Sequence, residues 1–192
     1  MHEVISLLIN RYDFFLQLLW EHIEISLSAS VIAIIVGGLL GLLIHEYKRL
    51  AGPVMLIVNF LYTIPSISML GLLLYVSGVG NTTAIIALVI YALLPMVRNT
   101  FTGLDQIKSD MREAGIALGL TRLQRLWNIE IPLAMPTIMA GIRTMLVMTI
   151  ALTGIASFIG AGGLGVAIYR GITTNQSALT IAGSLLIALL AV

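Results

Sequence analysis

Charged residues are scarce in this chain, where they make up 10% of 192 positions, compared with about 25% in an ordinary soluble domain. Hydrophobic residues account for 59% of the sequence, and the mean hydropathy is +1.05. Because so few polar side chains cannot cover a water-soluble globule, this composition predicts an integral membrane protein. Cysteine is absent, which excludes disulfide bonds and thiolate metal sites. The net charge of +1 gives no reason to expect nucleic acid as a partner.

The sequence also lacks the residue patterns of catalytic and cofactor sites. It contains no G-x-x-x-x-G-K-[ST] motif, so the chain by itself cannot hold ATP in a P-loop. The histidines His2, His22 and His45 do not have metal-ligand spacing, and we interpret His22 and His45 as residues of the membrane interface. We therefore expect a non-catalytic protein without a metal ion or cofactor.

Five apolar stretches come close to the roughly 20 residues that a helix needs to cross a bilayer. They are residues 23–45, 54–76, 82–97, 132–155 and 178–192. Residues 7–20, before the first stretch, form either an interfacial helix or the start of a long tilted first helix. The last stretch ends without a polar flank, so we expect the natural chain to continue beyond Val192. The predicted fold class is an all-α membrane protein, with one transmembrane domain over residues 1–192.

Basic residues in the short loops predict the orientation, because they favour the cytoplasmic side. If the five stretches alternate in direction, seven basic residues fall on one side and two, Arg11 and Arg170, on the other. The seven are Lys48, Arg49, Arg98, Lys108, Arg112, Arg122 and Arg125. We therefore expect a multi-pass protein of the plasma or inner membrane, with its N-terminus outside.

Two residues inside the apolar stretches are candidates for a path through the membrane. Pro65 interrupts the second stretch, and a bend there is tolerated where the opened backbone faces protein or water. A movable kink that lines a pore and a static packing kink fit the sequence equally well. Arg143 is the only formal charge in the interior of a stretch, since Glu24 lies at the edge of the first one, and interior charges usually face a cavity or a partner. We favour a pathway or gate contact over a structural ion pair or snorkelling.

Small residues recur every four positions in the first stretch, at Ala29, Ala33, Gly37 and Gly41. Such a stripe allows close approach of another helix. We favour packing within one bundle over a subunit interface.

The loop between the third and fourth stretches combines charge with helix-capping signals. Asp110 with Glu113 fits a helix start, and Gly119 fits a helix end. Thr121 with Gln124 forms a second capping box. We therefore predict two short helices with a bend at residues 119–121, before the next span begins at a proline. Such a loop either docks a soluble partner or rests its apolar faces on the membrane.

This loop, about residues 105–131, resembles the EAA loop of permease subunits of binding-protein-dependent ABC importers. That pattern is E-A-A, three residues, G, nine residues, then I-x-L-P. Here Glu113-Ala114-Gly115 precedes Gly119, and residues 129–132 read I-E-I-P. Gly115 replaces the second Ala and Ile131 replaces Leu.

The resemblance implies that the loop is a coupling helix seated in a groove of a soluble ATPase. The residues that it assigns to ATPase coupling are Glu113, Ala114, Gly115, Gly119 and Arg122. Ala114 and Gly115 would permit close approach of the ATPase, and Glu113 would meet a basic or hydrogen-bonding group there. The implied partners are cytoplasmic ABC ATPase subunits, a second permease subunit, identical or homologous, an external solute-binding protein and membrane lipid.

Further motifs resemble the osmoprotectant subgroup, whose substrates are glycine betaine, carnitine and choline. They are residues 62–67, 94–100, 132–136 with 141–143, and 157–165, and the likeness covers roughly residues 15–192. Aromatic faces hold quaternary ammonium groups, so Tyr62 joins Pro65 and Arg143 as a pathway candidate. Permeases for another small solute, such as methionine, share the architecture. An ATP-independent carrier or channel is the competing class, but no carboxylate occurs at the centre of any stretch, as a coupled carrier would require.

Overall fold

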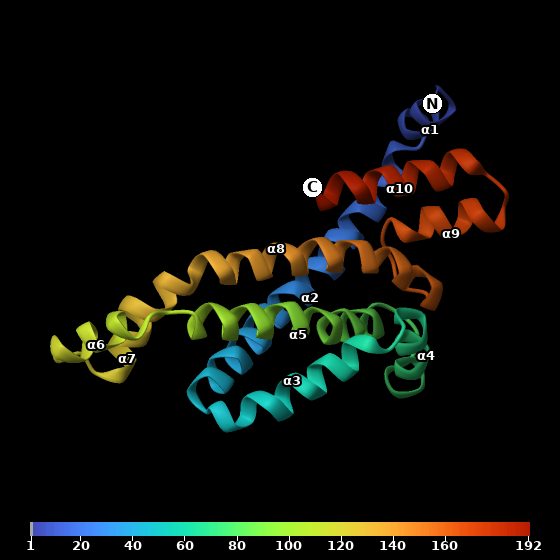
Figure 1. Ribbon diagram of the computed structural model, residues 1–192. Helices are drawn as coiled ribbons and strands as arrows, with labels where there is room; N and C mark the ends of the chain where they lie inside the picture. Colours follow the sequence, from blue (N-terminus) through green and yellow to red (C-terminus); the bar gives the residue numbers. More distant parts are fainter. Residues whose placement is uncertain (1) are drawn as a thin grey trace.

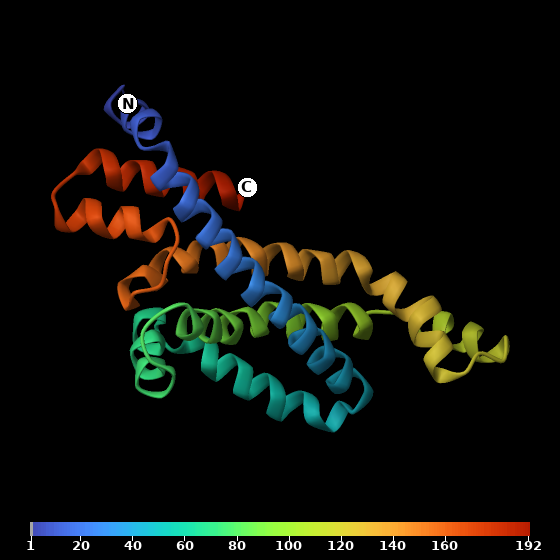
Figure 2. The same ribbon diagram turned by 180° about the vertical axis from the view of Figure 1, so that it is seen from behind.

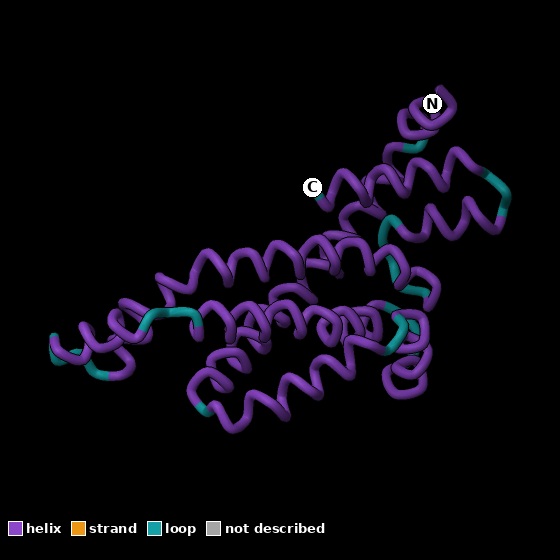
Figure 3. Tube along the Cα trace, viewed as in Figure 1, coloured by secondary structure: helices purple, strands orange, loops and turns teal. Residues whose placement is uncertain are grey.

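The computed structural model describes residues 2–192, which form helices joined by short connections, with no strand among them (Figure 1, Figure 3). The first half contains α1 (His2–Asn10), α2 (Tyr12–Glu46), α3 (Lys48–Thr63), α4 (Ser66–Ser77) and α5 (Asn81–Asp105). The second half contains α6 (Ser109–Ala117), α7 (Arg122–Arg125), the π-helical turn η1 (Leu126–Glu130), α8 (Ile131–Ala156), the 3-10 turn η2 (Ser157–Ile159), α9 (Gly165–Thr173) and α10 (Ser177–Ala191). The predicted all-α class is confirmed.

Three helical segments are long and apolar enough to cross a membrane, namely α2, α5 and the continuous segment Arg122–Ile159 that joins α7 and η1 to α8. A fourth crossing arises if α3 and α4 count as one span, although they are bent by 99°. The last predicted stretch is α10, whose 15 residues are fewer than the roughly 20 of a full crossing. The five predicted stretches are therefore three long helices, one broken pair and one short helix.

Helix α2 answers the question left open for residues 7–20. It begins at Tyr12 and runs for 35 residues, which is about 52 Å at 1.5 Å per residue. Because the hydrocarbon core is only about 30 Å thick, a helix of this length is expected to tilt. Both views show α2 crossing α5 and α8 diagonally (Figure 1, Figure 2). Most of residues 7–20 therefore belongs to a long first helix.

The small-residue stripe of α2 packs against α5 inside this chain. Ala29, Ala33, Gly37 and Gly41 are all buried. A Cβ added at Gly37 would lie 2.8 Å from the Cβ of Met96 in α5, so a larger side chain would push the two helices apart. Packing within one bundle, which we favoured for this stripe, is confirmed.

The second stretch breaks fully at Pro65, whereas we predicted one kinked span. Ile64 and Pro65 have extended backbones, with ψ angles of 128° and 138°, because proline disfavours a helical conformation in the residue before it. The Tyr91 hydroxyl of α5 donates to the Ile64 carbonyl, which satisfies the group that the broken helix leaves free. A hydrogen bond from a different helix thus stabilises the sharp turn.

The two ends of the bundle carry different elements. The α6–α7 segment projects beyond the long helices at one end, and the α2–α3 connection lies toward the same end (Figure 1, Figure 2). The α3–α4 break and the turn after α8 lie at the opposite end. This arrangement separates the predicted coupling loop from the Pro65 region by the length of the long helices.

Candidate functional site

The end of α6 forms as the sequence predicted. Gly119 has a φ of +74°, which is the left-handed conformation that favours glycine after a helix. The Gly119 N–H donates to the Ile116 carbonyl at 2.9 Å, and the Leu120 N–H donates to the Gly115 carbonyl at 3.1 Å. These two bonds make a Schellman motif, and they turn the chain sharply toward α7.

The capping box at Thr121 is also confirmed, since its side chain accepts from the Gln124 N–H while the Gln124 side chain accepts from the Thr121 N–H. The predicted cap at Asp110 is wrong. Helix α6 starts one residue earlier, at Ser109, after Lys108 as the N-cap, which makes no side-chain cap bond. Asp110 lies in the first turn, where a carboxylate interacts favourably with the helix dipole.

The second short helix of the loop does not end before the next span. Helix α7 continues through η1 into α8 as one segment, Arg122–Ile159, and the Ile131 N–H bonds to the Leu126 carbonyl five residues back. Pro132 therefore lies in the first turn of α8 without separating it from the loop. A wider π turn accommodates the proline, which cannot donate to a carbonyl in the preceding turn.

The projecting loop exposes apolar side chains beside the predicted coupling residues. Glu113, Ala114, Gly119 and Arg122 are all exposed. The large apolar side chains exposed on the same segment are Met111, Ile116, Leu118, Leu123 and Trp127. Leu118 is 78% exposed on a segment that projects beyond the long helices (Figure 1). Apolar surface of this kind, rimmed by polar residues, is typical of a docking site.

Gly115 differs from the other predicted coupling residues because it is buried. A Cβ at this position would lie 2.9 Å from Cδ1 of Ile129 and 3.3 Å from the Arg125 side chain. Gly115 thus faces η1 and α7 of its own chain. Its small size allows α6 to pack closely on the start of the long helix, and it does not offer the ATPase-facing surface that we expected.

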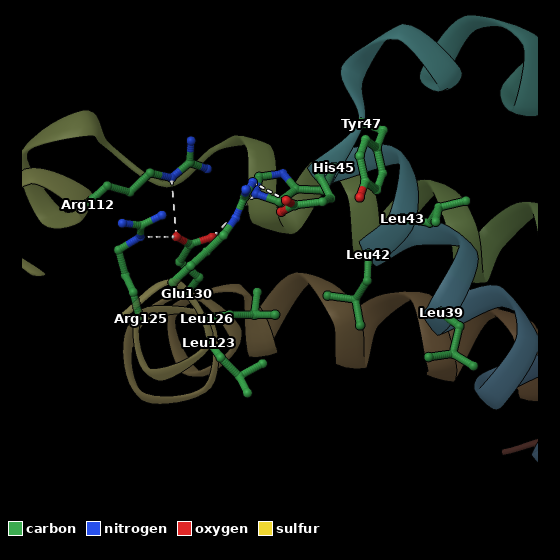
Figure 4. A pocket seen from close by; sticks show the side chains of 12 residues that line it. Leu39, Leu42, Leu43, His45, Tyr47, Arg112, Leu123, Arg125, Leu126 and Glu130 are labelled. Atoms are coloured by element: carbon green, nitrogen blue, oxygen red, sulfur yellow. Dashed lines mark hydrogen bonds and ion pairs between the residues drawn. The ribbon is translucent and has the colours of Figure 1, made fainter. Parts of the chain in front are cut away.

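The sequence analysis missed the most enclosed polar cluster of the loop, which is built around Glu130 (Figure 4). Glu130 is only 5% exposed. Its Oε1 lies 2.9 Å from Nε of Arg125 and 4.0 Å from Nε of Arg112, and its Oε2 lies 3.4 Å from Nε2 of His45. The His45 side chain is therefore enclosed in this cluster, and its location at the membrane interface stays a prediction. The sequence signalled only that opposite charges lie near one another, because Glu130 follows three arginines within 18 positions, and it gave no sign that Glu130 is buried.

The Glu130 cluster forms one wall of a cavity of about 480 Å³. The remaining lining comes mainly from leucines of α2 and α7, including Leu39, Leu42 and Leu123 (Figure 4). Two exposed ion pairs lie at the same end of the bundle, Lys48 with Asp105 and Arg122 with Glu46. Four of the seven basic residues that we assigned to one membrane side, Lys48, Arg112, Arg122 and Arg125, therefore lie at this end of the bundle.

The predicted pathway residues lie apart from the loop. Tyr62, at the end of α3, stacks edge-on against Tyr91 with ring centroids 6.1 Å apart, and its hydroxyl lies 3.6 Å from Sδ of Met148 in α8. Pro65 and Arg143 are exposed on the surface of this chain. Within residues 2–192, no ion pair involves Arg143, so a structural ion pair inside the chain does not explain it.

At the opposite end, side chains anchor three successive amides of the turn between η2 and α9. The N–H groups of Gly162, Gly163 and Leu164 donate to Oδ1 of Asn81, Oε2 of Glu21 and Nδ1 of His22, respectively. Nε2 of His22 lies 3.0 Å from the Ile150 carbonyl. His22 is fully buried, so its side chain serves packing inside this chain, and its location at the membrane interface stays a prediction.

The chain is similar to known transport proteins over most of its length. Residues 29–192 match the family described as "Binding-protein-dependent transport system inner membrane component". The chain is 46% identical over 178 residues to the glycine betaine/carnitine/choline transport system permease protein OpuCD of Bacillus subtilis (strain 168), covering 92% of this chain and 78% of the relative. It is 42% identical over 195 residues to the osmoprotectant import permease protein OsmW of Salmonella typhimurium (strain LT2), covering 99% and 91%.

Solved structures agree on the fold. A chain of the MetNI methionine ABC transporter in an inward-facing conformation matches with a TM-score of 0.82 at 21% identity, covering 92% of this chain and 89% of that chain. With the EAA-like loop projecting from this fold, the chain belongs to the family of binding-protein-dependent transport system inner membrane components, the permeases of ABC importers.

Proposed function

We propose that this chain is the transmembrane subunit of an ATP-driven importer of quaternary ammonium osmoprotectants, such as glycine betaine, carnitine or choline. The observation that carries the substrate class is the 46% identity over 92% of the chain to a permease named for these three compounds. The relative named for osmoprotectant import supports the same class at 42% identity. The chain supplies no ATPase motif, so a separate subunit hydrolyses ATP.

The ATPase docks on the projecting loop, with α6 as the coupling helix. The exposed face of Glu113 and Ala114, together with the neighbouring apolar side chains Ile116 and Leu118, supports this role. A polar contact at Glu113 and apolar burial at its neighbours would make a specific and tight interface. Gly119 fixes the direction in which α6 ends, and Arg122 flanks the contact.

A second permease copy, identical or homologous, completes the pore, and a solute-binding protein delivers the ligand from outside. ATP binding draws the ATPases together and opens the pore outward, and hydrolysis resets the inward state. The ligand must bind the two states with different affinity to bias this cycle, because equal affinity shifts nothing. With the loop in the cytoplasm, the N-terminus is outside.

Tyr62, Pro65 and Arg143 belong to the pathway or its gate. The broken backbone at Pro65 and the aromatic pair of Tyr62 with Tyr91 support this assignment. An aromatic face is suited to a quaternary ammonium group. Arg143, which is exposed on an apolar helix, needs water or a polar partner outside this chain, and a path at the interface of two permeases provides one.

Transport by the reconstituted importer tests the proposal. The permease is purified gently from native membranes, and the proteins that accompany it are identified by mass spectrometry. The complex is then placed in liposomes with ATP inside, and uptake of labelled glycine betaine, carnitine, choline and methionine is measured. We expect a co-purified ATPase and uptake of at least one quaternary amine. Uptake of methionine alone would show that the substrate is not a quaternary amine. Uptake without an ATPase would indicate a carrier or channel.

A further inference from the structure

The carboxylate of Glu130 joins parts of the chain that are far apart in the sequence. Arg112 comes from α6, Arg125 from α7, and His45 from the last turn of α2, and all three have a nitrogen within 4.0 Å of this carboxylate. Figure 4 shows the three side chains converging on it from different directions. A fourth element is involved, because Arg112 Nη2 donates to the Leu104 carbonyl near the end of α5 at 2.7 Å.

Burial makes this cluster costly to open. A buried charge is tolerated only when paired, and removing one partner leaves the other uncompensated. Nε of Arg112 and Nδ1 of His45 are buried without a hydrogen-bond partner among the described residues. The carboxylate of Glu130 therefore stabilises these two buried groups more than it would stabilise groups exposed to water. We expect the three side chains to move together.

Helix α6 has few other attachments to the bundle. Gly115 is its only buried residue, and it contacts the Ile129 and Arg125 side chains. Among residues 2–192, no apolar core cluster includes a residue of α6. The exposed pairs Lys48–Asp105 and Arg122–Glu46 do not involve α6, and pairs of this kind contribute little.

We propose that Glu130 is a positioning residue that locks the coupling helix α6 to α2, α5 and the start of α8, so that a displacement of α6 is transmitted to the membrane-spanning helices. This role rests on the proposed docking of an ATPase at α6. Glu130 itself faces inward and makes no contact with the ATPase. Without its charge, Arg112 and Arg125 face each other with no counter-charge between them, and α6 moves without carrying the long helices.

The first experiment compares ATP hydrolysis and solute uptake in the same proteoliposomes, which contain the complete importer and its binding protein. Glu130→Gln keeps the side-chain volume and an acceptor oxygen but removes the charge. We expect ATP hydrolysis to continue, while solute molecules imported per ATP fall at least tenfold. Glu130→Asp, which keeps the charge on a shorter side chain, should give a ratio between that of Glu130→Gln and that of the unmodified protein.

Asp105→Asn is the matched control. It also removes one carboxylate from an ion pair at the same end of the bundle, but this pair is exposed and joins α3 to α5. We expect its ratio of uptake to hydrolysis to stay within twofold of the unmodified protein. An unchanged ratio in Glu130→Gln, or an equal fall in Asp105→Asn, would overturn the proposal.

A second measurement uses the purified permease alone and does not depend on ATPase docking. The chain has no cysteine, so spin labels at Ile116→Cys in α6 and Leu39→Cys in α2 report this distance alone once the labelled permease is mixed with an excess of unlabelled permease, which removes distances between two copies. We expect Glu130→Gln to broaden the distance distribution and Asp105→Asn to leave it narrow. If α6 does not dock an ATPase but the distribution still broadens, the proposed function fails while the link through Glu130 stands. If Glu130→Gln cannot be purified, Glu130→Asp replaces it, and an unchanged distribution in that variant contradicts the link.

Discussion

The start of α9 packs so closely on the end of α8 that Gly165 has no room for a side chain. A Cβ at Gly165 would overlap the carbonyl oxygen and carbon of Gly154, and backbone atoms cannot yield as a flexible side chain can. We therefore expect Gly165→Ala to destabilise the purified permease by about 2–4 kcal/mol. Thermal unfolding in detergent, followed by tryptophan fluorescence, measures the loss.

Gly71→Ala is the matched control for this prediction. Gly71 lies inside α4, and a Cβ there would meet nothing within 4 Å. Because alanine has the better helix propensity, we expect Gly71→Ala to leave the midpoint of thermal unfolding equal or slightly raised. Equal midpoints for Gly165→Ala and the unmodified protein would show that the turn after α8 packs more loosely than the structure indicates.

Glu113 carries the second prediction at the residue scale. Its carboxylate is exposed, and in the proposed docking it meets a basic or hydrogen-bonding group of the ATPase. Glu113→Arg reverses the charge without disturbing a buried contact. We expect membrane insertion at the normal level, with uptake reduced at least tenfold and ATP hydrolysis no longer stimulated by the loaded binding protein. Normal uptake by this variant would remove Glu113 from the coupling role.

At the scale of elements, hydropathy predicted which segments are helical better than it predicted their directions. The apolar stretch 54–76 contains Pro65, so a bend was predictable. The 99° angle also involves a hydrogen bond from Tyr91 to the carbonyl of Ile64, two residues 27 positions apart. The local capping signal was correct at Thr121 and Gln124, where the capping box forms as predicted. Such a signal failed at Asp110, since several polar residues in succession can each begin a helix.

Tyr91→Phe tests the break between α3 and α4. The variant removes the donor to the Ile64 carbonyl and leaves that carbonyl without its partner, which costs about 1–3 kcal/mol when the group is buried. We expect a lower thermal midpoint and faster backbone hydrogen exchange around residues 61–66, measured by mass spectrometry. Tyr75→Phe is the control, because Tyr75 is 96% exposed, and it should behave as the unmodified protein. Exchange that stays equal in both variants would mean that Pro65 alone maintains the break.

At the scale of the whole molecule, the sequence predicted well at which end of the bundle the basic residues of the site lie. It predicted poorly which acidic residue they pair with. The count of basic residues in loops assigned Lys48, Arg112, Arg122 and Arg125 to one side, and they do gather at one end of the bundle. The sequence could not indicate that Glu130 is buried among them, because its burial depends on the end of α2, which is distant in the sequence, packing beside the loop. Long-range packing of this kind leaves no local pattern in the sequence.

The gathering of basic residues at one end of the bundle leads to a prediction about the orientation of the chain in its membrane. Because the chain has no cysteine, Ser6→Cys in α1 and Leu118→Cys in the loop each give a single reactive site. With a membrane-impermeant maleimide on right-side-out vesicles, we expect Ser6→Cys to be labelled directly and Leu118→Cys only after the vesicles are opened. Both positions are exposed in this chain, and vesicles from cells that produce the permease without its ATPase leave Leu118 uncovered, so burial does not limit the reaction at either position. The reverse pattern would place the loop outside, where no ATPase could reach it, and would contradict both the orientation and the coupling role of α6.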